Sequence, residues 1–217
     1  MNTIAISRLL GSDAGRIAQK VADSLGYDLV DKSILQGTLQ QYGLTRFGEL
    51  YTSPPNLWDL ANSKNLEMVS MLNETMQALA YRGRTVILAR GGYVALNKYA
   101  DVLNVRLHAP TDVRVERVMA RERITDRSKA ACQVAADDKA RIKFVERFYG
   151  CKWHDESDFD LVMNTDLIPA TTAEAWIIDA IAMLEAKTVP ANALLAKNTK
   201  VDPLLLSAIE EALELRV

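Results

Sequence analysis

Five short runs rich in β-branched residues alternate along the sequence with longer segments of helical character. The runs lie at Thr3–Ser7, Tyr27–Val30, Thr85–Arg90, Leu103–Ala109 and Phe159–Thr165. A strand, a helix and the next strand form a right-handed crossover, so repeated alternation predicts a parallel sheet with helices on both faces. The sequence therefore predicts an α/β protein with three layers and a five-stranded parallel sheet.

Most segments between these runs carry apolar residues at helical spacing, and the long segment over residues 57–82 has no proline. The segments expected to be helical are Gly15–Leu25, Leu57–Arg82, a segment that starts at Thr111, Lys129–Tyr149 and the segment around residues 173–184. The first of them stops before Gly26, a residue suited to end a helix. Each helix is expected to bury its apolar stripe on the sheet.

The chain has 217 residues, of which 49% are apolar, so one compact domain is expected. We place this domain at residues 1–186, and we interpret residues 187–217 as a linker and an extra C-terminal helix. Asp202 and Pro203 are suited to the N-cap and first turn of that helix. Two interpretations of its apolar stripe remain open: packing on its own domain, or contact with a partner such as a second copy.

Charge and cysteine content exclude several classes of protein. The formal net charge is −2, which offers no overall attraction to nucleic acid or anionic membranes. No window approaches 18 consecutive apolar residues, and the N-terminus has no basic stretch before its short apolar run. Cys132 and Cys151 are not part of a CxxC motif, so neither a disulfide framework nor a zinc site is predicted. We expect a cytoplasmic protein without nucleic-acid or membrane partners.

The loop after the first predicted strand is suited to bind an anion. Small residues let its backbone turn tightly and point N–H groups inward, while the following helix N-terminus adds a favourable dipole. The full Walker A pattern GxxxxGK[ST] is absent, because Gly11 to Arg16 reads GxxxGR with arginine in place of lysine. A plain strand-to-helix connection therefore remains the alternative.

A second glycine-rich turn, Ala89 to Tyr93, follows the third predicted strand and is expected at the same edge of the sheet. In it, Arg90 offers a planar donor fork that suits a phosphate, although a salt bridge at a turn is the alternative. Arg114, Arg117 and Arg121 follow at the spacing of one helix face. That face either points to the same edge or is solvated and paired with neighbouring glutamates.

Together these motifs resemble the cytidylate-kinase-like proteins. The run ISRLLGSDAGRIAQKVADSLGYDLVDKSIL is similar to the family's opening, and VILARGGYVAL to its turn after the third strand. RVERVMARERI resembles the arginine-bearing helix, DDKARIKFVERFYGCKW the lid region and FDLVMNT the last strand. The resemblance runs from about Thr3 to Leu184. It implies a P-loop nucleoside-monophosphate-kinase fold with a helical lid over residues 124–150, to which this chain adds a C-terminal helix.

The resemblance also implies roles for particular residues. ATP would sit on the first loop, formed by Arg8, Gly11, Ser12, Asp13, Ala14, Gly15 and Arg16. The acceptor nucleotide would lie near Asp31, Arg90 and Gly91. The transferring phosphoryl group would meet Arg16, Arg117, Arg121, Lys139 and Arg141. Mg²⁺ would accompany ATP, with the hydroxyl of Ser12, or of Ser7, as its candidate ligand.

The first loop departs from the family pattern. Asp13 stands where glycine is usual, Gly15 where arginine is usual, and Arg16 comes one position later. A carboxylate pointing into the loop would repel phosphate. Two functions are therefore carried forward: an ATP-dependent phosphotransferase acting on a CMP-like nucleoside monophosphate, and a catalytically weakened nucleotide-binding sensor or interaction protein with a degenerate loop. A kinase for another small acceptor is a third.

Overall fold

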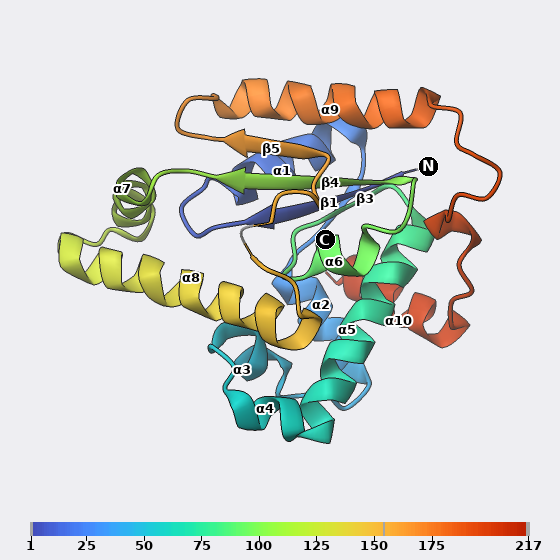
Figure 1. Ribbon diagram of the computed structural model, residues 1–217, viewed down its shortest axis with the longest axis horizontal. Helices are drawn as coiled ribbons and strands as arrows, with labels where there is room; N and C mark the ends of the chain where they lie inside the picture. Colours follow the sequence, from blue (N-terminus) through green and yellow to red (C-terminus); the bar gives the residue numbers. More distant parts are fainter. Residues whose placement is uncertain (1, 154, 216–217) are drawn as a thin grey trace.

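A five-stranded sheet forms the centre of the protein, seen in a computed structural model that describes residues 2–153 and 155–215 (Figure 1). The strand order is β2-β3-β1-β4-β5, and neighbouring strands pair in parallel. The strands are β1 (Thr3–Arg8), β2 (Asp28–Val30), β3 (Thr85–Ile87), β4 (Val102–His108) and β5 (Leu161–Asn164). The predicted parallel sheet is thus confirmed. However, β3 ends at Ile87, so Arg90 lies in the turn and not at the strand's last position.

The expected helices occur with shifted bounds: α1 (Ala14–Leu25), α5 (Ser63–Arg82), α7 (Thr111–Glu122), α8 (Arg127–Tyr149), α9 (Ala170–Ala186) and α10 (Pro203–Glu214). The prediction of one helix over residues 57–82 was wrong. The backbone of Asn62 is extended, and its side chain accepts a hydrogen bond from the N–H of Lys64, so Asn62 begins a new helix. The first part of the predicted segment is thus a separate short helix, α4 (Leu57–Ala61), and three further helices among the described residues were not predicted: α2 (Lys32–Gln41), α3 (Phe47–Thr52) and α6 (Gly92–Leu96).

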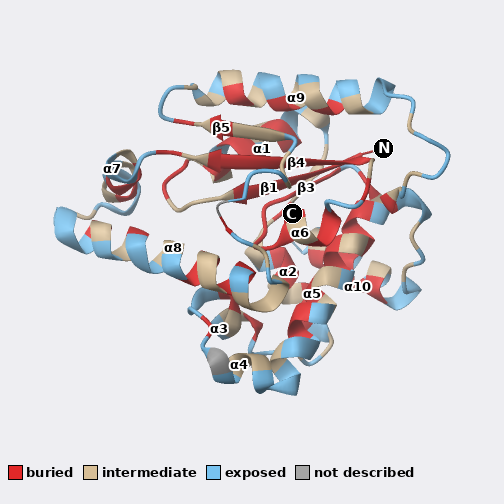
Figure 2. Cartoon of the chain, in the orientation of Figure 1, coloured by how far each residue is buried: buried red, intermediate tan, exposed pale blue. Residues whose placement is uncertain are grey.

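Helices cover both faces of the sheet, and each covered face has its own apolar core (Figure 2). Side chains alternate along β1, so Ile4 and Ile6 face α1 and α9, whereas Ala5 faces the opposite layer. That opposite layer contains α2, α5, α6 and α10. β1 is the middle strand of the sheet. The loop that follows it therefore lies at the centre of the edge formed by the carboxyl ends of the strands.

The C-terminal helix α10 packs on α2 and α5 of the same chain. Leu205, Ile209 and Ala212 are buried in the core that these helices share. Asp202 is the N-cap, and its carboxylate accepts a hydrogen bond from the N–H of Leu204 at 2.9 Å. The preceding segment is also held, because the carboxylate of Asp101 accepts hydrogen bonds from backbone N–H groups at residues 196 and 197.

Among residues 2–153 and 155–215, no helix combines the length and apolar character needed to cross a bilayer.

Candidate functional site

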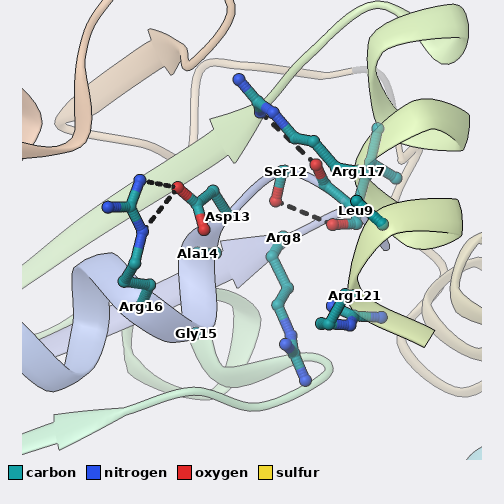
Figure 3. Close-up of a pocket in the computed structure, with 11 residues that line it drawn as sticks. Arg8, Leu9, Ser12, Asp13, Ala14, Gly15, Arg16, Arg117 and Arg121 are labelled. Atoms are coloured by element: carbon teal, nitrogen blue, oxygen red, sulfur yellow. Dashed lines mark hydrogen bonds and ion pairs between the residues drawn. The ribbon is translucent and has the colours of Figure 1, made fainter. Parts of the chain in front are cut away.

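The loop between β1 and α1 forms one wall of a hollow at the carboxyl edge of the sheet. Gly11 adopts φ +81°, and a Cβ atom there would lie 2.5 Å from the carbonyl oxygen of Arg114 on α7. Only glycine therefore lets the loop pack directly on α7. The hollow has a volume of about 680 Å³, and it brings the predicted loop residues together with Arg117 and Arg121 (Figure 3).

Asp13 and Arg16 pair with each other on one side of the loop. Arg16 Nε donates to Asp13 Oδ2 at 2.9 Å, and Arg16 Nη2 forms a second bond to the same oxygen. This hydrogen bonding and the charge of Asp13 raise the pKa of Arg16. Figure 3 shows both side chains directed away from Arg8 and Arg121. The Asp13 carboxylate is therefore compensated, but the Arg16 side chain is 60% exposed and turned outward.

The three arginines of α7 have three different environments. Arg114 is buried and donates two hydrogen bonds to Asp138 of α8, at 2.8 and 3.0 Å. Arg117 donates to the carbonyl and hydroxyl oxygens of Thr165, at 2.8 and 3.0 Å, and more weakly to the carbonyl oxygen of Gly11 at 3.4 Å. Arg117 therefore joins the loop to the end of β5.

Arg121 is half exposed and pairs with Glu122 at 2.7 Å, which is the predicted alternative of a solvated, glutamate-paired residue. The other glutamate considered, Glu116, pairs instead with Arg127. Arg121 still lines the hollow, where it faces the same side of the loop as Arg8 (Figure 3). It is thus the α7 arginine with the most open side chain at the hollow.

Ser12 is turned into the loop. Its hydroxyl is buried and donates to the carbonyl oxygen of Leu9 at 2.7 Å, while its own carbonyl oxygen accepts a hydrogen bond from the hydroxyl of Thr165. Ser7 is buried as well. In the described part of the chain, no group of three or more His, Cys, Asp or Glu side chains is arranged to hold a metal ion. Of the residues that line the hollow, Ser12 and Asp13 carry side-chain oxygens, the type of ligand that Mg²⁺ prefers.

A second cluster of cations surrounds Arg90 beside the hollow. Arg90 is only 4% exposed, its backbone N–H donates to the hydroxyl of Tyr51 at 2.6 Å, and its guanidinium carbon lies 5.0 Å from the centre of the Tyr51 ring. Its Nη2 contacts Asp137 of α8 at 3.2 Å. Its Nε and Nη1 atoms are buried and have no hydrogen-bond partner among the described residues. One nitrogen of the guanidinium thus forms a salt bridge, the alternative predicted for Arg90, while the other two nitrogens lack a hydrogen-bond partner among the described residues.

Positive charge exceeds negative charge in this cluster. Burial, followed by the charge of Arg141, lowers the pKa of Arg90 to about 10. Burial and then Arg141 also lower the pKa of Arg8, while burial and then Arg90 lower that of Lys32. Asp137 forms ion pairs with two members of the cluster, Arg90 and Arg141. A cluster of this kind favours a bound anion with several oxygen acceptors.

Other predicted residues lie in different settings. Asp31 caps α2 and accepts hydrogen bonds from the N–H groups of residues 33 and 34, at 2.8 and 3.4 Å. Gly91, at φ +72°, packs against Tyr149, whose ring would lie 2.5 Å from an added Cβ atom. Lys139 is exposed on α8 and is not among the residues that line the hollow.

Three residues of the cation cluster were missed. Lys32 and Asp137 lie within the segments that resemble the family's opening and its lid region, directly beside Asp31 and Asp138. Tyr51 carries no local signal, because it reaches Arg90 from a helix 39 positions earlier in the chain. Only the tertiary packing of α3 shows its contact.

A protein-family model described as the cytidylate kinase-like family matches residues 3–167. The chain belongs to this family. A cytidylate kinase of Saccharolobus islandicus is 24% identical over 190 residues, which cover 86% of this chain and 94% of that enzyme. A uronate isomerase of Corynebacterium glutamicum is 28% identical over 147 residues, which cover 65% of this chain. The chain spans only about a quarter of that isomerase, 27% of its length.

Solved structures show the same fold. An uncharacterized protein from Eubacterium ventriosum superposes with a TM-score of 0.60 at 22% identity, covering 84% of this chain and 99% of the other. A shikimate kinase from Bacteroides thetaiotaomicron gives a TM-score of 0.50 at 14% identity, covering 85% and 98%. The likeness confirms the predicted three-layer α/β fold, and at these identities it concerns the fold alone.

Proposed function

We propose that this member of the cytidylate kinase-like family is an ATP-dependent phosphotransferase that transfers phosphate to a CMP-like nucleoside monophosphate. The observation that carries this proposal is the buried guanidinium of Arg90, with Nε and Nη1 unpartnered among the described residues. Phosphoryl transfer depends on positioning and on compensation of negative charge more than on covalent chemistry. Arg90 beside Arg8 and Arg141 supplies such charge next to the loop.

The hollow and the cation cluster around Arg90 would bind different substrates. The donor phosphates of ATP would lie in the hollow, against the backbone N–H groups at the start of α1. The acceptor phosphate would bind Arg90 through one of its free donors, Nε or Nη1, together with the neighbouring Nη2, which now contacts Asp137. Arg141 and Arg121 would meet the transferring group from the sides. The Ser12 hydroxyl, which now donates to the carbonyl oxygen of Leu9, would be the candidate protein ligand for Mg²⁺, and the metal would supply positive charge against the donor phosphates.

The helix α8 would act as the lid. Asp137 of this helix contacts Arg90, and Arg141 of the same helix pairs with Asp137. A lid in this position excludes water, which would otherwise hydrolyse ATP at an open site. The acceptor phosphate would replace Asp137 as the partner of Arg90.

A second candidate function rests on the ion pair of Asp13 and Arg16. This pair holds the Arg16 side chain on the outer side of the loop (Figure 3). The alternative function is therefore a nucleotide-binding sensor without turnover. Isothermal titration with ATP and with each nucleoside monophosphate, followed by a coupled assay for ADP release, separates the two. We expect one monophosphate to raise the melting temperature most and to support ADP release. Nucleotide binding without turnover for any acceptor would support the sensor.

Three further expectations accompany the proposal: a cytoplasmic location, the absence of nucleic acid as a partner, and a possible homodimer. Light scattering on the purified chain measures its mass in solution and tests the last of these. A titration with labelled oligonucleotides tests the second.

A further inference from the structure

The cation at the start of α1, Arg16, borders the hollow but is held in an ion pair with Asp13. Gly15 has no side chain, and Arg16 is paired with Asp13 on the outer side of the loop. From α1 itself, a polyphosphate bound against the helix start would therefore meet backbone N–H groups and the helix dipole, but no unpaired cation. A triphosphate carries more negative charge than these partial charges compensate.

Arg8, the last residue of β1, extends across this gap. It lines the hollow, and its Nη1 atom lies 3.8 Å from the position that a Cβ atom of Gly15 would take. In Figure 3 its guanidinium passes the first turn of α1 on the side opposite Asp13 and Arg16. Among the described residues, no hydrogen bond or ion pair involves the Arg8 guanidinium, which leaves its five donors available.

Arg8 also lies between the two proposed phosphate sites. The charges that act on it come from Arg121 at the hollow and from Arg141 and Asp137 at the cation cluster. Burial is the largest cause of its lowered pKa, so the guanidinium is partly desolvated and interacts strongly with a nearby anion. A planar guanidinium can hold two oxygens of one phosphate, or bridge two phosphates.

We infer that Arg8 replaces the cation missing from the start of α1 and binds the polyphosphate of the donor nucleotide in the hollow. This inference rests on the proposed function, since the donor is taken to be ATP. It also explains Gly15: alanine would make ordinary contact with Arg8, whereas a longer side chain would compete for the space of the guanidinium. The cation that contacts the polyphosphate would thus come from the end of β1 instead of the start of α1.

The test is a titration with inorganic tripolyphosphate and with ATP, in the absence of any acceptor. We expect Arg8→Ala to weaken both by about 10- to 100-fold, the scale of one or two charge-assisted hydrogen bonds. Arg8→Gln keeps a polar side chain without the charge and should give a similar loss, and Arg8→Lys, which keeps the charge, a smaller one. Arg16→Ala is expected to lose several-fold less than Arg8→Ala. Arg127→Ala removes an exposed arginine that lies outside both sites and is the matched control.

A rescue experiment sharpens the result. Adding Gly15→Arg to Arg8→Ala returns a cation to the helix start, so we expect polyphosphate affinity to recover. Melting temperatures without ligand show that each variant is folded. If Arg8→Ala and Arg8→Gln bind like the wild type, or if Arg16→Ala loses as much as Arg8→Ala, the inference is overturned. Wild-type protein that binds no polyphosphate overturns both proposals, whereas polyphosphate binding without transfer to any monophosphate overturns only the phosphotransferase.

Discussion

Replacing Arg90 by methionine tests the acceptor site most directly. Two donors of this guanidinium, Nε and Nη1, are buried and without a partner in the described part of the chain. A hydrogen bond to a charged group contributes about 1.5–3 kcal/mol, so losing two of them removes at least about 3 kcal/mol of acceptor binding. This corresponds to a loss of about 100-fold in kcat/KM for the acceptor.

The same substitution is expected to leave the ligand-free protein at least as stable. In the wild type, Arg90 is a buried cation with one ion-pair partner, and its desolvation is already visible in a pKa lowered to about 10. Methionine removes the charge and fills much of the volume, while Asp137 keeps Arg141 as its partner. Lost activity with retained or higher melting temperature is therefore the expected combination.

The assay is coupled ADP release, with acceptor and ATP varied separately. We expect the apparent affinity for ATP to change little, because Arg90 is not among the residues that line the donor hollow. Arg127→Met, which replaces an exposed arginine on α8 outside both sites, is the control for the loss of an arginine. Unchanged acceptor kinetics in Arg90→Met, or equal losses for ATP and acceptor, would refute the assignment of Arg90 to the acceptor phosphate.

Three other substitutions test the packing around the site. Gly91→Ala should lower the free energy of unfolding by more than Gly43→Ala in urea denaturation, since both glycines have positive φ but only the first would place a Cβ atom against Tyr149. Asp202→Ala should cost about 1 kcal/mol through loss of the N-cap of α10, and faster amide exchange in α10 would show it. Asp137→Asn should increase the rise in melting temperature caused by inorganic phosphate, because a competing carboxylate charge leaves the cation cluster.

The sheet was predictable because its strands are nearly continuous apolar runs, which parallel strands buried on both faces require. The short helices α3 and α6 were not, since they contain only six and five residues, too few to show a helical period. The break at Asn62 depends on a single side chain that caps the following helix. Such a cap competes with helix continuation, and sequence spacing alone does not decide between them.

The site was predictable where residues follow directly after strands. The loop at Gly11 and the turn at Arg90 both follow this rule, and both lie at the carboxyl edge. The direction of Arg16 could not be foreseen, because it depends on the left-handed backbone of Asp13 at φ 61°. Lys139 and Arg141 are two positions apart on one helix, so they cannot share a face, and the buried Arg141 leaves Lys139 toward solvent.

The contact between Gly91 and Tyr149 has a mechanical consequence for the lid. Tyr149, in the last turn of α8, rests on the turn that carries Arg90, and its hydroxyl donates to the Asn73 side chain of α5 at 2.7 Å. This end of α8 is therefore pinned to the body of the protein. In the proposed role of α8 as a lid, we expect the amino-terminal end of the helix to move more than the end at Tyr149 when a nucleotide enters.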